Sequence, residues 1–184
     1  NERYWECQMA DVWLGTWQQC IPYIQNFRRG IDVGFRGGDF AKNMLPYFDD
    51  VVGFEFRLKS KKFKVENLLV YGVALGDSET TSFTSMNAGR IKGSGPREVK
   101  IKKLDSYGYT DVDFIKIDVE GYEPKVLLGA KQTIDRCNPV LCVEINRDDN
   151  YSQWLLESWG YELQEVDHLQ GHDFIFTRSD WEPE

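Results

Sequence analysis

The chain has 184 residues, of which 41% are hydrophobic and 14% aromatic, which is typical of one packed globular domain and excludes a mainly disordered chain. Its net charge of −8 disfavours binding to nucleic acid or to an anionic membrane. No apolar run approaches the roughly 20 residues of a membrane span, and no signal peptide is recognisable. The four cysteines lack metal-binding spacing and are expected to be free thiols, which favours a reducing, cytoplasmic location.

The N-terminal segment has the pattern of an amphipathic helix. Four large apolar side chains follow one another at steps of four residues: Trp5, Met9, Trp13 and Trp17. Such a stripe predicts a helix that packs against a sheet. Pro22 then predicts a break and a second short helical piece before the first strand.

Five short apolar runs follow, as expected of parallel strands that are covered on both faces. They are Gly30 to Val33, Val51 to Phe56, Leu68 to Leu75, Val112 to Ile117 and Val140 to Ile145. Helices are predicted from Asp39 to Phe48 and from Pro124 to Ile134. The pattern indicates an α/β fold with a doubly wound, mostly parallel sheet.

Two segments depart from this alternation. Thr80 to Lys103 predicts two added strands around a mobile loop, Met86 to Pro96, which is a candidate lid. After a helix from Ser152 to Ser158, the runs Tyr161 to Val166 and Phe174 to Thr177 predict a closing antiparallel hairpin.

A glycine-rich turn, Gly34-Phe-Arg-Gly-Gly, follows the first strand and precedes a helix, the context that a nucleotide-binding loop requires. Gly34 and Gly37 would let a ligand approach the backbone closely. Glu55 ends the next run roughly 20 residues later, where a carboxylate can accept both hydroxyls of a ribose. The alternative is a plain tight turn and a surface charge.

The dinucleotide fingerprint GxGxxG is not satisfied, because Arg36 stands at its second glycine. A pyrophosphate could not approach the loop in the usual way. This argues against a nicotinamide-dependent oxidoreductase and favours a smaller adenosine-bearing ligand.

Acidic side chains end two neighbouring strands. Lys116, Asp118 and Glu120 alternate onto one face, and Glu144 and Asn146 end the next strand in the same way. Such a cluster can hold or deprotonate an acceptor hydroxyl, or bind a hard cation such as Mg²⁺ through oxygen ligands. The alternative is that Lys116 pairs with an acid and Glu120 caps the next helix.

The two histidines, His168 and His172, fall in the predicted hairpin turn. A general base there is one interpretation, and a surface turn is the favoured one.

The chain resembles the FkbM-like group of class I S-adenosylmethionine-dependent methyltransferases. The matching elements run in the family's order across roughly residues 30 to 146. They are Ile31-Asp-Val-Gly-Phe-Arg-Gly-Gly-Asp-Phe, Val52-Gly-Phe-Glu-Phe, Val73-Ala-Leu-Gly-Asp, Leu104-Asp-Ser, Phe114-Ile-Lys-Ile-Asp-Val-Glu-Gly-Tyr-Glu, Val126-Leu-Leu-Gly-Ala and Val143-Glu-Ile. Two positions depart from the family pattern, because Arg36 replaces an asparagine and Phe56 replaces a proline.

The resemblance implies a three-layer fold around a seven-stranded sheet whose last strand is antiparallel, with a small inserted β segment. It also implies S-adenosylmethionine as cofactor. Its methionine end would lie near Asp32, Gly34 and Gly37, its carboxylate could pair with Arg36, its ribose would bind Glu55, and its adenine would border Ala74, Leu75 and Asp77.

Residues 1–184 are expected to form one methyltransferase domain, with an N-terminal helical segment (1–29), a cofactor-binding core (30–146) and a C-terminal helix and hairpin (147–184). The implied reaction is methyl transfer to a hydroxyl of a sugar or other small polyhydroxylated metabolite. Asp118, Lys116 and Glu144 are its catalytic candidates. A metal requirement and the oligomeric state stay open.

Two alternatives to that reaction remain. The first is a non-catalytic binding module derived from a methyltransferase, which the departures at Arg36 and Phe56 keep open. The second is an RNA methyltransferase that uses the basic clusters at 59–64 and 97–103, although the acidic total disfavours it.

Overall fold

The computed structural model describes residues 12–58, 65–84, 93–146, 150–165 and 172–182. The strands are β1 (Arg29–Val33), β2 (Asp50–Phe54), β3 (Leu68–Tyr71), β4 (Ala74–Leu75), β5 (Thr80–Thr84), β6 (Arg97–Lys102), β7 (Val112–Ile117), β8 (Val140–Glu144), β9 (Tyr161–Leu163) and β10 (Asp173–Arg178). The helices are α1 (Val12–Cys20), η1 (Ile21–Tyr23), α2 (Ala41–Met44), η2 (Leu104–Tyr107), α3 (Glu123–Cys137) and α4 (Asn150–Ser158).

The main sheet has seven strands in the order β3-β2-β1-β7-β8-β10-β9. The pairs from β3 to β8 are parallel, and β10 is antiparallel to both of its neighbours. The predicted mostly parallel sheet with a C-terminal antiparallel hairpin is therefore confirmed. The order reverses at β1, so β1 and β7 form the switch point at which open α/β sheets bind ligands.

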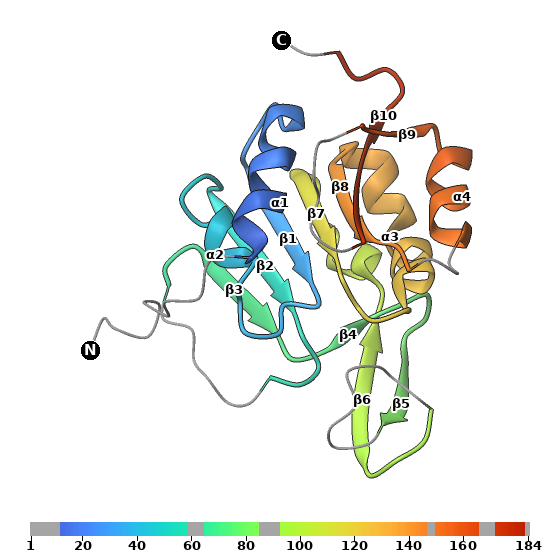
Figure 1. Cartoon of the computed structure of the whole chain (residues 1–184). Helices are drawn as coiled ribbons and strands as arrows, with labels where there is room; N and C mark the ends of the chain where they lie inside the picture. Colours follow the sequence, from blue (N-terminus) through green and yellow to red (C-terminus); the bar gives the residue numbers. More distant parts are fainter. Residues whose placement is uncertain (1–11, 59–64, 85–92, 147–149, 166–171, 183–184) are drawn as a thin grey trace.

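Helices cover both faces of this sheet, with α1 and α2 on one side and α3 and α4 on the other (Figure 1). On the first face Trp17 of α1 lies edge-on to Phe114 of β7, with ring centroids 5.5 Å apart. On the second face Val126 and Leu127 of α3 pack into the core with Ile115 of β7. The α1 stripe thus faces the core at Trp17, whereas Trp5 and Met9 lie outside the described residues.

Two predicted elements were too long. The run Leu68 to Leu75 divides at Gly72 into β3, which stays in the main sheet, and β4, which pairs with β6 in a second sheet. The helix predicted from Asp39 to Phe48 is the single turn α2. Pro46 accounts for its early end, because proline has no N–H to continue the helix.

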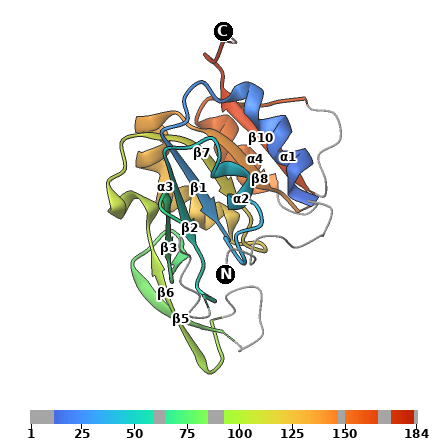
Figure 2. The same cartoon turned by 90° about the vertical axis from the view of Figure 1, so that its left-hand side faces the viewer.

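The inserted β segment is a small sheet of order β4-β6-β5, in which the two predicted strands, β5 and β6, pair antiparallel. It extends beyond the C-terminal ends of β1, β2 and β3, as both views show (Figures 1 and 2). The candidate lid from Met86 to Pro96 falls mainly on residues 85–92, which lie outside the described residues.

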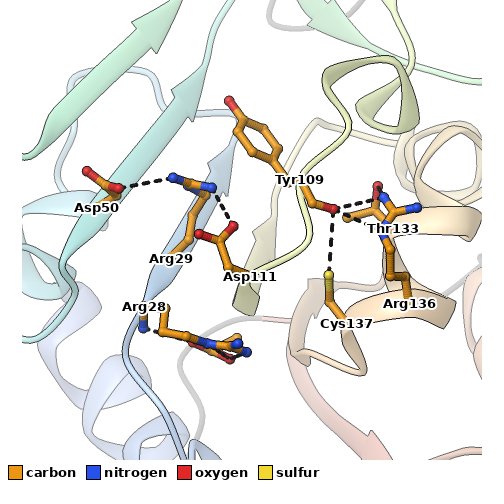
Figure 3. Close-up of polar contacts among 9 residues, drawn as sticks. Arg28, Arg29, Asp50, Tyr109, Asp111, Thr133, Arg136 and Cys137 are labelled. Carbon is orange, nitrogen blue, oxygen red and sulfur yellow. Dashed lines mark hydrogen bonds and ion pairs between the residues drawn. The ribbon is translucent and has the colours of Figure 1, made fainter.

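At the opposite end of the strands, where β1 and β7 begin, two arginines form ion pairs with neighbouring segments (Figure 3). Arg29 forms ion pairs with Asp50 and Asp111, and its guanidinium lies 4.7 Å from the ring centroid of Tyr109. Beside it Arg28 pairs with Asp113 at 2.5 Å. These contacts fix the start of β1 against β2 and β7.

The cysteines that the structure describes, Cys20, Cys137 and Cys142, are free thiols. Within the described ranges, no helix has the length and apolarity needed to cross a membrane.

Candidate functional site

A pocket of about 460 Å³, a volume that includes the open solvent at its mouth, lies at the C-terminal ends of β1, β2 and β7, beside β4. Its lining is Val33, Gly34, Arg36, Phe54, Glu55, Phe56, Arg57, Val73, Ala74, Leu75, Asp118, Val119, Glu120 and Tyr122. The pocket therefore combines an apolar wall with charged groups gathered at strand ends. Its position is the one expected of a ligand site in an open α/β sheet.

The loop after β1 is held against both neighbouring strands. Gly34 has a φ of +93°, and a Cβ atom built there would lie 1.8 Å from the carbonyl oxygen of Asp118. On the other side, the Gly34 and Phe35 N–H groups both donate to the carbonyl of Phe54 at 3.0 and 3.1 Å. Only glycine fits where β1 and β7 come this close.

The second glycine that this loop requires is Gly38, which sequence reasoning missed. Gly38 has a φ of +88°, and a Cβ atom there would lie 2.7 Å from the ring of Phe35. Gly37 is exposed, and a Cβ atom there would meet only an Asp39 carboxylate oxygen at 3.9 Å. Gly37 and Gly38 are adjacent, and nothing in the sequence indicates which of them takes the left-handed conformation.

Glu55 follows β2 directly, and its side chain is only 4% exposed. Its carboxylate accepts hydrogen bonds from the Arg36 N–H at 3.0 Å and from the Arg57 N–H and Nε at 2.7 and 3.3 Å. A carboxylate has about four acceptor positions, so three of them are used. Two ribose hydroxyls would bind if the Arg57 guanidinium, which is 31% exposed, moved aside.

The adenine-side candidates divide into two groups. Ala74 and Leu75 line the pocket, whereas Asp77 is outside the lining and lies 3.8 Å from the Lys125 ammonium. The wall is fixed from behind by a close approach of two glycines. A Cβ atom on Gly129 of α3 would lie 1.8 Å from the carbonyl oxygen of Gly76, which explains glycine at position 129, and a Cβ atom on Gly76 would lie 2.9 Å from a methyl group of Ile101.

Arg36 reaches across the pocket to the end of β7. Its guanidinium donates to Asp118 Oδ1 at 3.2 Å and also pairs with Glu120. Arg36 and Glu120 both have left-handed backbones, with φ of 48° and 60°. The side chain of Glu120 thus forms an ion pair with Arg36 instead of capping the next helix, because no side-chain hydrogen bond caps the start of α3.

Glu123 is a further residue that sequence reasoning missed. It is fully buried, and its Oε1 accepts hydrogen bonds from the Val119 and Gly121 N–H groups at 3.0 and 3.1 Å. These bonds fix the loop that presents Asp118 and Glu120 to the pocket. The available signal was a second glutamate three positions after Glu120, in the first turn of the predicted helix.

A cluster of buried and half-buried ionisable side chains lies beside the pocket on the face that α1 and α2 cover. It consists of Asp32, Lys116, Asp118, Glu144 and Asp173. Lys116 is 1% exposed and pairs with Asp173, which stands opposite Glu144 in the β8–β10 register. Lys116 is outside the pocket lining, and its main contact is the ion pair with Asp173. Pairing with an acid was the alternative to a catalytic role that the sequence left open.

Two carboxyl groups of this cluster titrate near neutral pH. Burial raises the pKa of Asp32 to about 7; the Asp118 and Glu55 charges add to this, while Lys116 and the Ala41 N–H oppose it. Burial also raises the pKa of Glu144 to about 7, and the charge of Asp118 and its hydrogen bond to Glu144 raise it further. Burial lowers the pKa of Lys116, but the surrounding Cys142, Asp173 and Asp118 outweigh it and raise the pKa overall. Lys116 is therefore a fixed positive charge among acids.

The remaining candidates contribute little to this geometry. His172 is half-buried before β10 and its carbonyl accepts a hydrogen bond from the Ile145 N–H, while His168 lies outside the described residues. In the part of the chain that the structure describes, no group of three or more His, Cys, Asp or Glu is arranged to hold a metal ion.

Solved structures share this architecture. The crystal structure of the methyltransferase FkbM from Methylobacillus flagellatus KT matches with a TM-score of 0.57 at 16% identity, over 82% of this chain and 43% of that one. The precorrin 8w decarboxylase from Methanobacterium thermoautotrophicum matches at 0.52 and 11% identity, over 88% and 87% of the two chains. The precorrin-6y C5,15-methyltransferase from Geobacter metallireducens GS-15 matches at 0.51 and 12%, over 87% and 85%. The fold is thus that of the Rossmann-like methyltransferases.

The family is narrower than the fold. The model of the methyltransferase FkbM domain matches residues 60–176, which is more than half of the chain. The chain therefore belongs to the FkbM methyltransferase domain family, as the sequence resemblance predicted. It spans 43% of the length of the FkbM structure from Methylobacillus flagellatus. No curated protein matches it.

Proposed function

We propose that this chain transfers a methyl group from S-adenosylmethionine to a hydroxyl oxygen of a sugar or another small polyhydroxylated metabolite. The observation that carries the proposal is the position of Asp118. It lines the pocket and lies beside Glu144, a carboxyl group whose pKa is raised to about 7 by burial and by the Asp118 charge. The proposed binding site for the methyl donor and a group that could take up a proton would thus meet at one strand end.

The pocket fits the cofactor in both chemistry and position. Apolar side chains of Phe54, Ala74 and Leu75 suit an adenine, and the buried Glu55 carboxylate suits a ribose. The cofactor would supply an electrophilic methyl group on a sulfonium. The exposed backbone at Gly37, next to the lining residue Arg36, would lie beside its amino-acid end. The role of Asp77 is indirect, through Lys125 beside the pocket wall.

The chain's own part in the reaction is positioning and proton removal. Aligning an acceptor hydroxyl with the methyl group supplies most of what methyl transfer needs. Asp118, paired with Glu144, would accept the hydroxyl proton. Lys116 would act from below the pocket, where it pairs with Asp173 and places a positive charge beside Asp118.

The acidic side chains at the ends of β7 and β8 favour an acceptor molecule that is neutral and rich in hydroxyl groups. Asp118, Glu120 and Glu144 provide acceptor oxygens for several hydroxyl groups and would repel a phosphate. The proposal therefore favours a sugar over RNA.

The test is transfer of isotopically labelled methyl groups from S-adenosylmethionine to a panel of sugars and polyols. The intact protein should label an acceptor, and Asp118→Asn should lower the rate at least about 100-fold. The rate should rise with pH up to about 7, as Glu144 ionises, and then level off. Full turnover by Asp118→Asn would rule out the proposed role of Asp118. Cofactor binding without labelling of any acceptor, RNA included, would favour the binding-module alternative.

A further inference from the structure

Arg36 occupies a charged bridge at the rim of the pocket. Its guanidinium, 44% exposed, is shared between Asp118, whose side chain is 10% exposed, and Glu120, whose side chain is 43% exposed. Exposed ion pairs contribute little to stability, because water solvates the separated charges almost as well. The pair with Glu120 can therefore open at low cost, whereas the largely buried Asp118 needs a new partner when its pair opens.

The backbone on both sides of the bridge is held in an unusual conformation. Arg36 and Glu120 are two of the three described non-glycine residues with positive φ. Left-handed conformations of such residues are uncommon and gather at ligand sites. Because the Arg36 N–H donates to Glu55 Oε2 at 3.0 Å, the backbone of Arg36 is held beside the proposed ribose-binding carboxylate.

We infer that Arg36 selects the cofactor by its carboxylate, and that Asp118 and Glu120 are its partners only until the cofactor binds. This inference rests on the proposed function. A planar guanidinium binds a carboxylate through two parallel hydrogen bonds, a geometry that lysine or glutamine cannot reproduce. In the proposed binding mode, the amino-acid end of the cofactor would offer such a carboxylate.

The exchange of partners has a consequence for the order of binding. When Arg36 turns to the cofactor, Asp118 loses a cationic partner and its carboxylate is left to meet the acceptor hydroxyl. The cofactor therefore binds before the acceptor. Arg36 itself takes no part in proton transfer and acts as a specificity-determining residue.

The experiment is calorimetric titration with three ligands. S-adenosylhomocysteine has the carboxylate, its decarboxylated analogue lacks only that group, and 5′-methylthioadenosine lacks the whole amino-acid end. The intact protein should prefer S-adenosylhomocysteine over the decarboxylated analogue by about 10-fold or more. Arg36→Gln should reduce that preference to within about 3-fold and leave methylthioadenosine binding unchanged.

Arg29→Gln is the matched control. Arg29 also bridges two carboxylates, Asp50 and Asp111, but at the opposite edge of the sheet. The preference for the carboxylate should be retained in this variant. Loss of the preference in both variants would point to a general change in structure and would overturn the assignment to Arg36.

A second variant tests the exchange itself. Glu120→Gln removes a resting partner of Arg36, so S-adenosylhomocysteine should bind about 2- to 5-fold more tightly while methylthioadenosine is unaffected. Weaker binding in this variant would overturn the exchange. Equal affinity of the intact protein for the first two ligands would overturn the inference and leave the proposed function standing, whereas binding of none of the three would overturn both.

Discussion

Gly34 and Asp118 approach so closely that a single methyl group does not fit between them. A Cβ atom on Gly34 would lie 1.8 Å from the Asp118 carbonyl oxygen, and the φ of +93° is one that L-residues avoid. The contact joins the end of β1 to the end of β7. Through it the proposed cofactor-binding loop and the proposed proton acceptor share one rigid frame.

Gly34→Ala should therefore destabilise the protein by roughly 3 kcal/mol or more, because backbone atoms must shift and the left-handed conformation is strained. Urea unfolding followed by circular dichroism measures the change. Gly37→Ala is the control, since its side chain would point into open space and should change the stability by less than about 0.5 kcal/mol. Similar losses in both variants would show that the tight contact is not what fixes the loop.

The contact between α3 and β4 gives a second pair of glycine variants with opposite signs. Gly129→Ala should destabilise by about 2 kcal/mol or more, because its Cβ atom would lie 1.8 Å from the Gly76 carbonyl oxygen. Gly15→Ala in α1 meets nothing within 4 Å and should stabilise by up to about 1 kcal/mol, since alanine favours helices. Thermal melting distinguishes the two. A stabilising Gly129→Ala would contradict the packing of α3 described above.

The raised pKa of Asp32 predicts that the stability of the folded protein depends on pH. Its pKa rises from 3.8 to about 7 in the folded state, so the protonated form favours folding and this contribution is lost as pH rises from about 4 to 7. Asp32→Asn should therefore gain stability relative to the intact protein across this interval, by a few kcal/mol. The groups that face Asp32, namely Lys116, Asp118 and Glu55, are unchanged in the variant.

Urea midpoints of both proteins at pH 5, 6, 7 and 8 measure this difference. A difference that stays constant with pH would show that Asp32 titrates at its ordinary value.

Lys116 and Asp173 should behave as one structural unit. Lys116→Met alone leaves Asp173 buried without its partner and should cost about 3 to 5 kcal/mol. The double variant Lys116→Met with Asp173→Leu should recover most of that loss, because apolar residues can replace a buried ion pair. Chemical unfolding of the single and double variants makes the comparison. If the double variant is as unstable as the single one, the pair is not the main role of Lys116 in folding.

The strands could be predicted closely because their signal is local. The run from Val112 to Ile117 coincides with β7, since a buried parallel strand must be apolar on both faces. The ends of α2 and β4 were less predictable. Pro46 ends α2 where apolar periodicity suggested more turns, and β4 leaves the main sheet because its partner, β6, comes from about 25 residues further along the chain.

Site residues that directly follow a predicted strand could be placed from the sequence. Glu55 and Asp118 follow strands directly, so their places in the pocket followed from the sheet. Asp173 and Glu123 escaped notice because their roles depend on tertiary contacts. Asp173 reaches Lys116 only through the pairing of β10 with β8, and Glu123 binds N–H groups of a loop whose shape the sequence does not show.

Cofactor binding tests the central claim most directly. Calorimetric titration of S-adenosylmethionine and S-adenosylhomocysteine into the intact protein should show one site, and Glu55→Ala should weaken it at least about 100-fold because the ribose hydroxyls lose their acceptor. Glu98→Ala, a substitution in β6 away from the pocket lining, should bind as the intact protein does. Binding that is abolished only by the Glu55 change would establish the pocket as the cofactor site; absence of binding by the intact protein would contradict the account.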